Sequence, residues 1–314
     1  MVKKVVCITG CLGFIASHLT QECLDRDWLV IGYDKQTYAA RDDVLDGFLS
    51  CKNFKFCKQD INDIAMLPDC DYVINVAAES HVSNSIVSSH EFIDTNIRGV
   101  QHLLDLTRYH RYDKKPLFFH FSTDEVYGDT KTGRFLETDP LKPSNPYAAT
   151  KAAADMLVHA WGRTYDIPYI IYRPTNNYGT GQHEEKLIPK TCRYLSLGRK
   201  IPLHDNGSPV RTWLHALDTA SGVLRILDSG IENEIFNVSG NFEQSNYKTV
   251  EQIMLHYNIY NETDYMDLNY GRPGQDVRYA VNDDKLQNIG WYPRRSFEEG
   301  LKWAVHYYKE KFGV

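Results

Sequence analysis

Short runs of apolar, often β-branched residues recur along the chain, separated by turns and by segments with helical spacing. Such runs are typical of strands buried on both faces of a parallel sheet. The expected strands lie at residues 5–9, 28–33, 55–58, 71–78, 116–121, 169–172 and 235–238. The expected helices lie at residues 17–27, 90–111 and 146–165, with another opening near 185–189. Strands that alternate with helices predict an α/β protein with a Rossmann-type doubly wound parallel sheet.

The composition is typical of a globular protein, with 314 residues of which 42% are apolar and 24% are charged. This length allows one large domain or two smaller ones. A formal net charge of −6 gives no reason to expect a nucleic acid or a membrane surface as a partner. No apolar run approaches the ~18 residues of a membrane span, and the first residues predict a strand rather than a signal peptide.

The seven cysteines are odd in number and scattered, and none forms a C-x-x-C pair. This usage predicts reduced thiols in a cytoplasmic protein. Neither a disulfide framework nor a metal site is expected.

A glycine-rich turn, Gly10-Cys11-Leu12-Gly13-Phe14-Ile15-Ala16, follows the first expected strand and leads into a helix. Glycines there let the backbone approach a pyrophosphate, to which the helix N-terminus presents N–H groups and a positive dipole. Asp34 ends the second expected strand, where an acid can bind the adenosine ribose hydroxyls. An acid in that place also repels a 2′-phosphate. The pattern therefore predicts a site for NAD rather than NADP.

Two adjacent carboxylates stand where the strand at 116–121 ends, in the sequence Ser122-Thr123-Asp124-Glu125-Val126-Tyr127-Gly128. Ligands of open α/β sheets bind at the carboxyl ends of the strands. An Asp-Glu pair there indicates an acid and a base acting on one substrate. Taken alone, such a pair is more often part of a solvated loop.

A third group, Pro146-Tyr147-Ala148-Ala149-Thr150-Lys151, opens the helix at 146–165. Tyr147 and Lys151 are four residues apart and so share one helical face. From there the ammonium is expected to lower the phenol pKa, normally near ~10, and to hold the nicotinamide ribose. A Y-x-x-x-K spacing is common by chance, but here it follows the strand that carries Ser122 and Thr123.

These motifs together resemble the extended short-chain dehydrogenase/reductase family. Nearly the whole chain is similar to the nucleoside-diphosphate-glucose 4,6-dehydratases of that family. The matching stretches are 34–39, 77–82, 122–129, 176–179, 185–189 and 272–279. The sequence Thr123-Asp124-Glu125 separates these enzymes from their relatives. The epimerases generally lack the Asp-Glu pair, and UDP-glucuronate decarboxylases keep only the glutamate.

The resemblance implies a conversion of the glucose unit to a 4-keto-6-deoxy sugar. Tyr147 would take the C4 hydroxyl proton while the C4 hydride passes to NAD, and Thr123 would hydrogen-bond the C4 oxygen. Glu125 would then remove the C5 proton as general base, while protonated Asp124 donates to the departing C6 hydroxyl. Return of the hydride to C6 and reprotonation of C5 complete the reaction. Like-charge repulsion between the adjacent carboxyls favours their opposite protonation states.

The same resemblance assigns residues to each ligand. The catalytic set is Thr123, Asp124, Glu125, Tyr147 and Lys151. The cofactor-binding set is Gly10, Leu12, Gly13, Phe14, Ile15, Asp34, Lys35, Thr37, Asp60, Ile61, Val76, Ala77, Ala78, Ser80, Thr95, Ser122, Tyr147, Lys151 and Asn177. The substrate-binding set is Ser80, Thr123, Asn176, Lys186, Leu187, Pro202, His204, Arg211, Asn246, Arg272 and Gln275.

The implied organisation has two parts. Residues 1–175, with a return segment at about 212–240, would form the NAD-binding Rossmann domain. Residues 176–211 and 241–314 would form a smaller C-terminal α/β region that binds the sugar nucleotide. Members of the family commonly pair through a four-helix bundle, so a homodimer through helices near 90–111 and 145–165 is expected.

Several positions depart from the family pattern. Ala16 replaces the last glycine of the turn, and Asn75 stands where the thymidine-linked enzymes usually have histidine. Further departures that affect nucleotide recognition are Ser83, Asn84, His204 and Gln275. The segment 202–212 is closer to the UDP-glucose enzymes of rhamnose synthesis, so both dTDP and UDP stay open.

Two other functions are compatible with the expected fold. A sugar-nucleotide 4-epimerase or decarboxylase could use the same scaffold, but neither matches the Asp-Glu pair. A non-catalytic NAD-sensing or RNA-binding protein is disfavoured by the intact Tyr147 and Lys151 and by the acidic charge balance.

Overall fold

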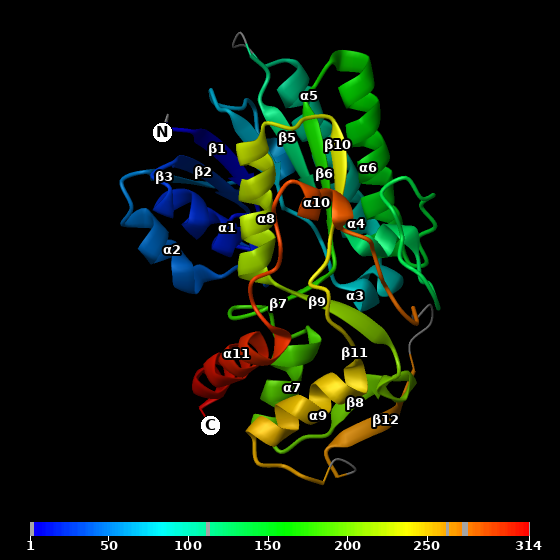
Figure 1. Cartoon of the computed structure of the whole chain (residues 1–314). Helices are drawn as coiled ribbons and strands as arrows, with labels where there is room; N and C mark the ends of the chain where they lie inside the picture. Colours follow the sequence, from blue (N-terminus) through cyan, green and yellow to red (C-terminus); the bar gives the residue numbers. More distant parts are fainter. Residues whose placement is uncertain (1–2, 111–113, 262–263, 272–275, 314) are drawn as a thin grey trace.

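A computed structural model describes residues 3–110, 114–261, 264–271 and 276–313. Its main feature is a seven-stranded sheet in the order β10-β6-β5-β4-β1-β2-β3, in which every pair is parallel. In Figure 1 this sheet fills the upper half of the molecule and the smaller elements the lower half. The strands are β1 (Val5–Thr9), β2 (Leu29–Asp34), β3 (Phe54–Lys58), β4 (Tyr72–Asn75), β5 (Leu117–Phe121), β6 (Tyr169–Pro174) and β10 (Glu234–Val238). The Rossmann-type α/β prediction is confirmed.

Helices cover both faces of this sheet. On one face α1 (Phe14–Asp25), α2 (Asp42–Leu49) and α8 (Ala216–Ser229) pack over a shared apolar core. On the other, α5 (Val100–Arg108) and α6 (Pro146–Tyr165) cover a second core. The result is a three-layer arrangement, visible around the sheet in Figure 1.

Most of the expected elements occur, with shifted ends. The first helix begins at Phe14 rather than residue 17, because Gly13 already has the extended backbone of an N-cap. The fourth strand stops at Asn75, so residues 76–78 lie in the loop that follows it. The expected helix at 90–111 is divided into α4 (His90–Ile93), a π-helical turn (Asp94–Gly99) and α5.

The smaller region is built from segments on either side of β10. Its elements are β7 (Asn176–Tyr178), α7 (Leu187–Ser196), β8 (Ile201–His204), β9 (Val210–His215), β11 (Glu243–Ser245), α9 (Asn246–His256), β12 (Met266–Tyr270) and α11 (Phe297–Phe312). Helix α10 (Asp284–Asn288) instead lies beside β10 (Figure 1), and its Leu286 packs in the core of the large sheet. Strands β11, β9 and β7 form one small sheet, and β12 and β8 form another. Helices α7, α9 and α11 pack over a third apolar core.

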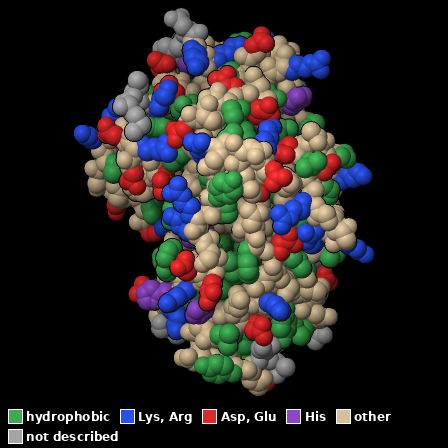
Figure 2. Space-filling model, viewed as in Figure 1, with side chains coloured by type: hydrophobic (Ala, Val, Ile, Leu, Met, Phe, Trp, Pro, Cys, Tyr) green, Lys and Arg blue, Asp and Glu red, His purple; other side chains and the backbone are tan. Residues whose placement is uncertain are grey.

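The surface carries charges of both signs. On the face seen in Figure 2, acidic and basic side chains are interspersed over both halves of the molecule. No helix within the described ranges is long and apolar enough to span a membrane.

Candidate active site

A cavity of about 310 Å³ opens at the carboxyl ends of β1 and β4. Chain order along the sheet reverses between these two strands, because β1 lies between β2 and β4. Such a switch point leaves a crevice outside the strand ends, which is where ligands of open α/β sheets bind. The predicted glycine turn, carboxylate pair and Tyr147-Lys151 pair all reach this cavity.

The glycine turn forms the floor of the cavity. Gly10 has a left-handed backbone (φ 65°), and a Cβ on it would lie 2.8 Å from the Cα of Ala77. Only glycine therefore allows the turn to pass this close to the loop after β4. Gly13 caps α1 without a side-chain hydrogen bond, so no side chain occupies the first amides of that helix. These features fit the pyrophosphate of a dinucleotide.

Asp34 joins the glycine turn to the end of β2. Its Oδ2 accepts a hydrogen bond from the Leu12 amide at 3.0 Å, and its Oδ1 accepts one from the Gln36 amide at 2.7 Å. Burial raises the pKa of this carboxyl, while the two amides oppose that effect. The carboxylate is thus fixed at the cavity wall, in the place expected for an acid that binds a ribose.

Every predicted cofactor-binding residue except Leu12 lines the cavity. Leu12 is fully buried, and its contribution is the amide that orients Asp34. At one wall, Lys35 lies 3.2 Å from Asp60, whose side chain caps the short helical turn Ile61–Asp63. The assignment of the individual residues to NAD stays a prediction.

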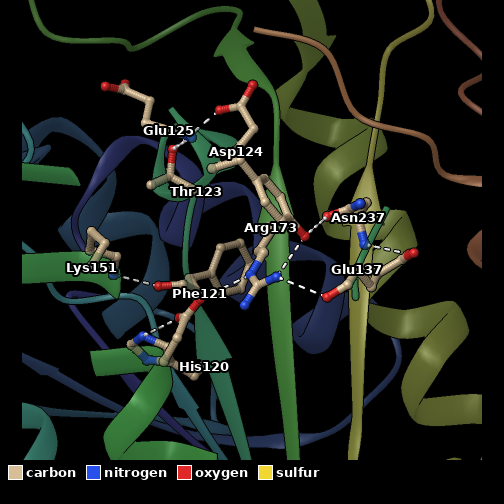
Figure 3. Close-up of polar contacts among 11 residues, drawn as sticks. His120, Phe121, Thr123, Asp124, Glu125, Glu137, Lys151, Arg173 and Asn237 are labelled. Atoms are coloured by element: carbon tan, nitrogen blue, oxygen red, sulfur yellow. Dashed lines mark hydrogen bonds and ion pairs between the residues drawn. The ribbon is translucent and has the colours of Figure 1, made fainter. Parts of the chain in front are cut away.

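The two adjacent carboxyls differ in environment. Asp124 is 2% exposed, whereas Glu125 is only partly buried. Thr123 holds them in place, because its hydroxyl donates to Asp124 Oδ1 at 3.2 Å and accepts from the Glu125 amide at 3.3 Å (Figure 3). Burial, and next the charge of Glu125, raise the pKa of Asp124 to about 8. Asp124 can therefore carry a proton at neutral pH.

Tyr147 and Lys151 are presented by the first turns of α6. Asn145 begins this helix by accepting a hydrogen bond from the Ala148 amide at 2.9 Å, and Pro146 occupies the first helical position. The Lys151 ammonium donates to the carbonyl of Phe121 at 2.5 Å (Figure 3). Burial lowers the pKa of Lys151 to about 8.

The pKa of Tyr147 is raised in this structure, so the lowering expected from the Lys151 ammonium stays a prediction. Burial raises the pKa of the phenol, the charge of Glu125 adds to the rise, and the Thr123 hydroxyl only partly opposes it. The sequence shows the helical spacing to Lys151 but not how completely the phenol is removed from water.

Sequence reasoning missed two residues that hold Glu125, and a third that holds one of them. Its Oε2 accepts hydrogen bonds from the Tyr279 hydroxyl at 3.2 Å and from the Asn145 amide group at 3.4 Å. The Tyr279 hydroxyl also makes a short hydrogen bond to Asp276. Tyr279 belongs to the stretch at 272–279 that matches the family pattern, so a signal for it was present in the sequence.

The predicted substrate-binding residues divide into three groups. Those lining the cavity are Ser80, Thr123, Asn176 and Lys186, and the Lys186 ammonium donates to the Ser80 carbonyl at 3.0 Å. Those outside its lining are Leu187, Pro202, His204, Arg211 and Asn246. Arg272 and Gln275 lie outside the described residues. These assignments also stay predictions.

Arg211 nevertheless lies close to the predicted catalytic residues. Its guanidinium is stacked over the Tyr279 ring at 4.5 Å and donates to the Asp276 carbonyl at 3.1 Å. The charge of Arg211 also lowers the pKa of Asp124, against the larger effect of burial.

Comparison with known proteins settles the family. The model for GDP-mannose 4,6-dehydratases matches residues 7–303. This chain belongs to that family. It is therefore an extended short-chain dehydrogenase/reductase of the nucleotide-sugar dehydratase type. Its parallel sheet, glycine turn and Tyr-Lys helix agree with that membership.

Three relatives illustrate the similarity. The low-salt glycan biosynthesis protein Agl12 of Haloferax volcanii is 40% identical, over 96% of this chain and 98% of the relative. A dTDP-glucose 4,6-dehydratase of Haemophilus influenzae is 37% identical, over 96% of this chain and 97% of the relative. The structure of the dTDP-glucose 4,6-dehydratase DesIV of Streptomyces venezuelae, solved with NAD bound, is 33% identical with a TM-score of 0.93 and covers 98% of both chains.

Within the described part of the chain, no three His, Cys, Asp or Glu side chains are grouped so as to hold a metal ion.

Proposed function

We propose that the chain is an NAD-dependent nucleoside-diphosphate-glucose 4,6-dehydratase, which forms the 4-keto-6-deoxy sugar nucleotide. The observation that carries the proposal is the Asp124-Glu125 pair beside Tyr147 and Lys151 in one cavity. An alcohol oxidation needs only the Tyr-Lys pair. The additional acid and base supply what the elimination of water requires. The relatives named dTDP-glucose 4,6-dehydratases support the same activity.

The cofactor proposal is NAD. The left-handed Gly10, the capping Gly13 and the fixed Asp34 carboxylate fit a dinucleotide whose adenosine ribose has free hydroxyls. When bound, NAD supplies a hydride acceptor with a positively charged nicotinamide ring. That charge and the Lys151 ammonium would offset the raised pKa of Tyr147, so that Tyr147 can accept the C4 hydroxyl proton.

The protein's carboxyls would then carry out the elimination. Oxidation at C4 acidifies the C5 proton, which Glu125 removes while Tyr279 and Asn145 hold its Oε2. Asp124, protonated near neutral pH, donates its proton to the C6 hydroxyl, and the C6–O bond breaks to release water. NAD bound in this cavity would accept the hydride from C4 and supply it to C6, so it would be regenerated. Glu125 would return its proton to C5. The proton that Tyr147 gains from the C4 hydroxyl equals the one that Asp124 gives to the departing water, so proton exchange with solvent restores both side chains.

The nucleotide is proposed to be dTDP or UDP. The named dTDP-glucose relatives support the former, and the sequence at 202–212 keeps UDP as the alternative. The test is to incubate the holoenzyme with dTDP-glucose, UDP-glucose and GDP-mannose, and to weigh the products. We expect dTDP-glucose or UDP-glucose to lose one water and give a 4-keto product that absorbs in alkali. A product with unchanged mass and only the C4 epimer would overturn the dehydratase proposal in favour of an epimerase.

Two domains are proposed, as expected from the sequence. The NAD-binding domain comprises residues 1–175 and a return segment at about 212–240. The sugar-nucleotide-binding region comprises residues 176–211 and 241–314. The large sheet draws on the first set of segments and the third core mainly on the second, which supports the division. Some residues cross it, because Trp213 packs in the third core, and Leu286 and Trp291 pack in the core of the large sheet. A cytoplasmic location is also proposed, supported by seven cysteines that are all free.

A homodimer is proposed through α4, α5 and α6. Large apolar side chains are exposed on these helices and beside them, including Ile93 at 43%, Met156 at 52% and Val87 at 88%. We expect Met156→Arg to weaken pairing, because an arginine would be buried at the centre of the helical interface. Sedimentation should then show a shift from dimer to monomer. Trp303→Arg, at a 51% exposed position on α11, is the matched control. A wild-type monomer, or an equal response from both variants, would contradict the proposal.

A further inference from the structure

A line of buried polar side chains crosses the sheet below the cavity. The Thr9 hydroxyl donates to Asn75 Oδ1 at 2.7 Å, and the Asn75 amide nitrogen lies 3.2 Å from His120 Nδ1. Since Asn75 can only donate through that nitrogen, His120 Nδ1 is the acceptor and its Nε2 carries the hydrogen. Nε2 lies 3.7 Å from Asp155 Oδ1. The hydrogen bond from Asn75 fixes the tautomer, and Nε2 faces Asp155 at a distance longer than a hydrogen bond.

Asp155 is the centre of this line. It is fully buried, and its Oδ2 accepts a hydrogen bond from Arg173 Nε at 2.9 Å. Arg173 is itself fixed, because its Nη1 donates to the Tyr127 hydroxyl at 2.5 Å. The Tyr127 hydroxyl in turn donates to Asn237 on β10 at 2.8 Å. Burial raises the pKa of Asp155, and the charge and hydrogen bond of Arg173 oppose that rise and hold the carboxyl in one orientation.

Asp155 also lies on the catalytic face of α6. Tyr147, Lys151 and Asp155 follow one another at four-residue intervals, and all three are buried. Side chains with this spacing are neighbours along one helical face. The fixed negative charge is thus placed next to the ammonium that serves Tyr147.

Two other ionisable neighbours of Lys151, His120 and Asp124, do not supply a negative charge in place of Asp155. Burial, with the charges of Lys151 and Arg173, holds the pKa of His120 well below its usual value, so the imidazole is neutral. Asp124 is largely protonated at neutral pH. The charge of Asp155 raises the pKa of Lys151 against the effect of burial. The ionisable groups around Lys151 and Asp155 are Tyr147 of α6, His120 of β5, Arg173 of β6, and Asp124 and Glu125 after β5.

We propose that Asp155 is a positioning residue of the oxidation step, whose carboxylate, held by Arg173, keeps Lys151 as the ammonium that supports Tyr147. This inference rests on the proposed function. It assigns a catalytic purpose to an ion pair that could otherwise be only structural. The distinguishing consequence is a change in pH dependence rather than a loss of folding.

The experiment isolates the oxidation step in a Glu125→Gln background, where the reaction is expected to stop at the C4 ketone. Formation of reduced nicotinamide is followed by its absorbance in a single turnover, as a function of pH. In the Glu125→Gln single variant, which keeps Asp155, the rate of oxidation should fall as pH rises through about 8, where Lys151 loses its proton. Asp155→Asn should move this fall to lower pH by about one unit or more, because an opposite charge no longer favours the ammonium. Asp155→Glu, which keeps the charge, should largely restore the profile.

Asp218→Asn is the matched control. Asp218 is also fully buried and paired with an arginine, Arg295 at 2.7 Å, but it does not line the cavity. Both Asp→Asn variants should unfold at lower temperature, and only Asp155→Asn should shift the pH profile. The double variant Asp155→Asn/Arg173→Gln removes both charges, so it should fold without a buried unpaired guanidinium and show the same shift.

The outcomes separate the inference from the proposed function. An unmoved profile in Asp155→Asn and in the double variant, with lowered thermal stability, would make Asp155 purely structural. If no reduced nicotinamide forms in the Glu125→Gln background with any glucose nucleotide, the proposed function itself fails. A shift seen equally in Asp218→Asn would show a global effect and would also overturn the inference.

Discussion

Glu125→Gln should stop exchange of the C5 hydrogen with solvent while leaving oxidation at C4 intact. Glutamine keeps the shape and the hydrogen-bond partners of Glu125 but cannot accept the C5 proton. Turnover to the 4-keto-6-deoxy product should fall by roughly 10²–10⁴, the usual contribution of a positioned general base. Single-turnover absorbance should still show reduced nicotinamide, and mass spectrometry in heavy water should show no deuterium at C5.

The matched control for this variant is Glu299→Gln. Glu299 lies in the first turn of α11, outside the cavity lining, where it pairs with the N-cap Ser296. In the Glu299→Gln variant, turnover and exchange of the C5 hydrogen should remain close to those of the unmodified enzyme. Undiminished deuterium incorporation in Glu125→Gln would remove Glu125 from the role of base. Loss of the oxidation step together with exchange would mean that the substitution damages the site more widely.

The sheet and the positions of the catalytic groups were predictable from the sequence because their signals are local. Each central strand is a largely apolar run, and each candidate catalytic residue follows a strand or lies at the start of a helix. The rule that strand ends share one edge then brings residues such as Asp34 and Glu125 to the same cavity. Helix ends were less accurate, as with the π-helical turn at Asp94–Gly99, which periodicity alone does not reveal.

The supporting contacts were not predictable because their partners are distant in sequence. Tyr279 reaches Glu125 across 154 residues, and Tyr127 reaches Asn237 across 110. The raised pKa of Tyr147 likewise depends on burial by several segments at once. Sequence spacing therefore located the acid, the base and the phenol, while their protonation states required the folded environment.

Asp124→Asn should separate proton removal at C5 from departure of the C6 hydroxyl. Asparagine is nearly the same shape but is no general acid, so turnover should fall by roughly 10²–10⁴. Glu125 remains, and deuterium should therefore still enter C5 from heavy water. The ratio of exchange to product, measured by mass spectrometry in one reaction, should rise sharply compared with the unmodified enzyme.

The same ratio tests the protonation state of Asp124. Its raised pKa of about 8 means that the proton is present below that pH and is lost as pH rises through it. In the unmodified enzyme the ratio of exchange to product should therefore increase above pH 8. Deprotonation of Lys151 near the same pH slows the oxidation that precedes both events, so it cancels from the ratio. In Asp124→Asn the ratio should not change with pH. A constant ratio in the unmodified enzyme would contradict Asp124 as the acid, because proton donation to the leaving hydroxyl would then depend on another group.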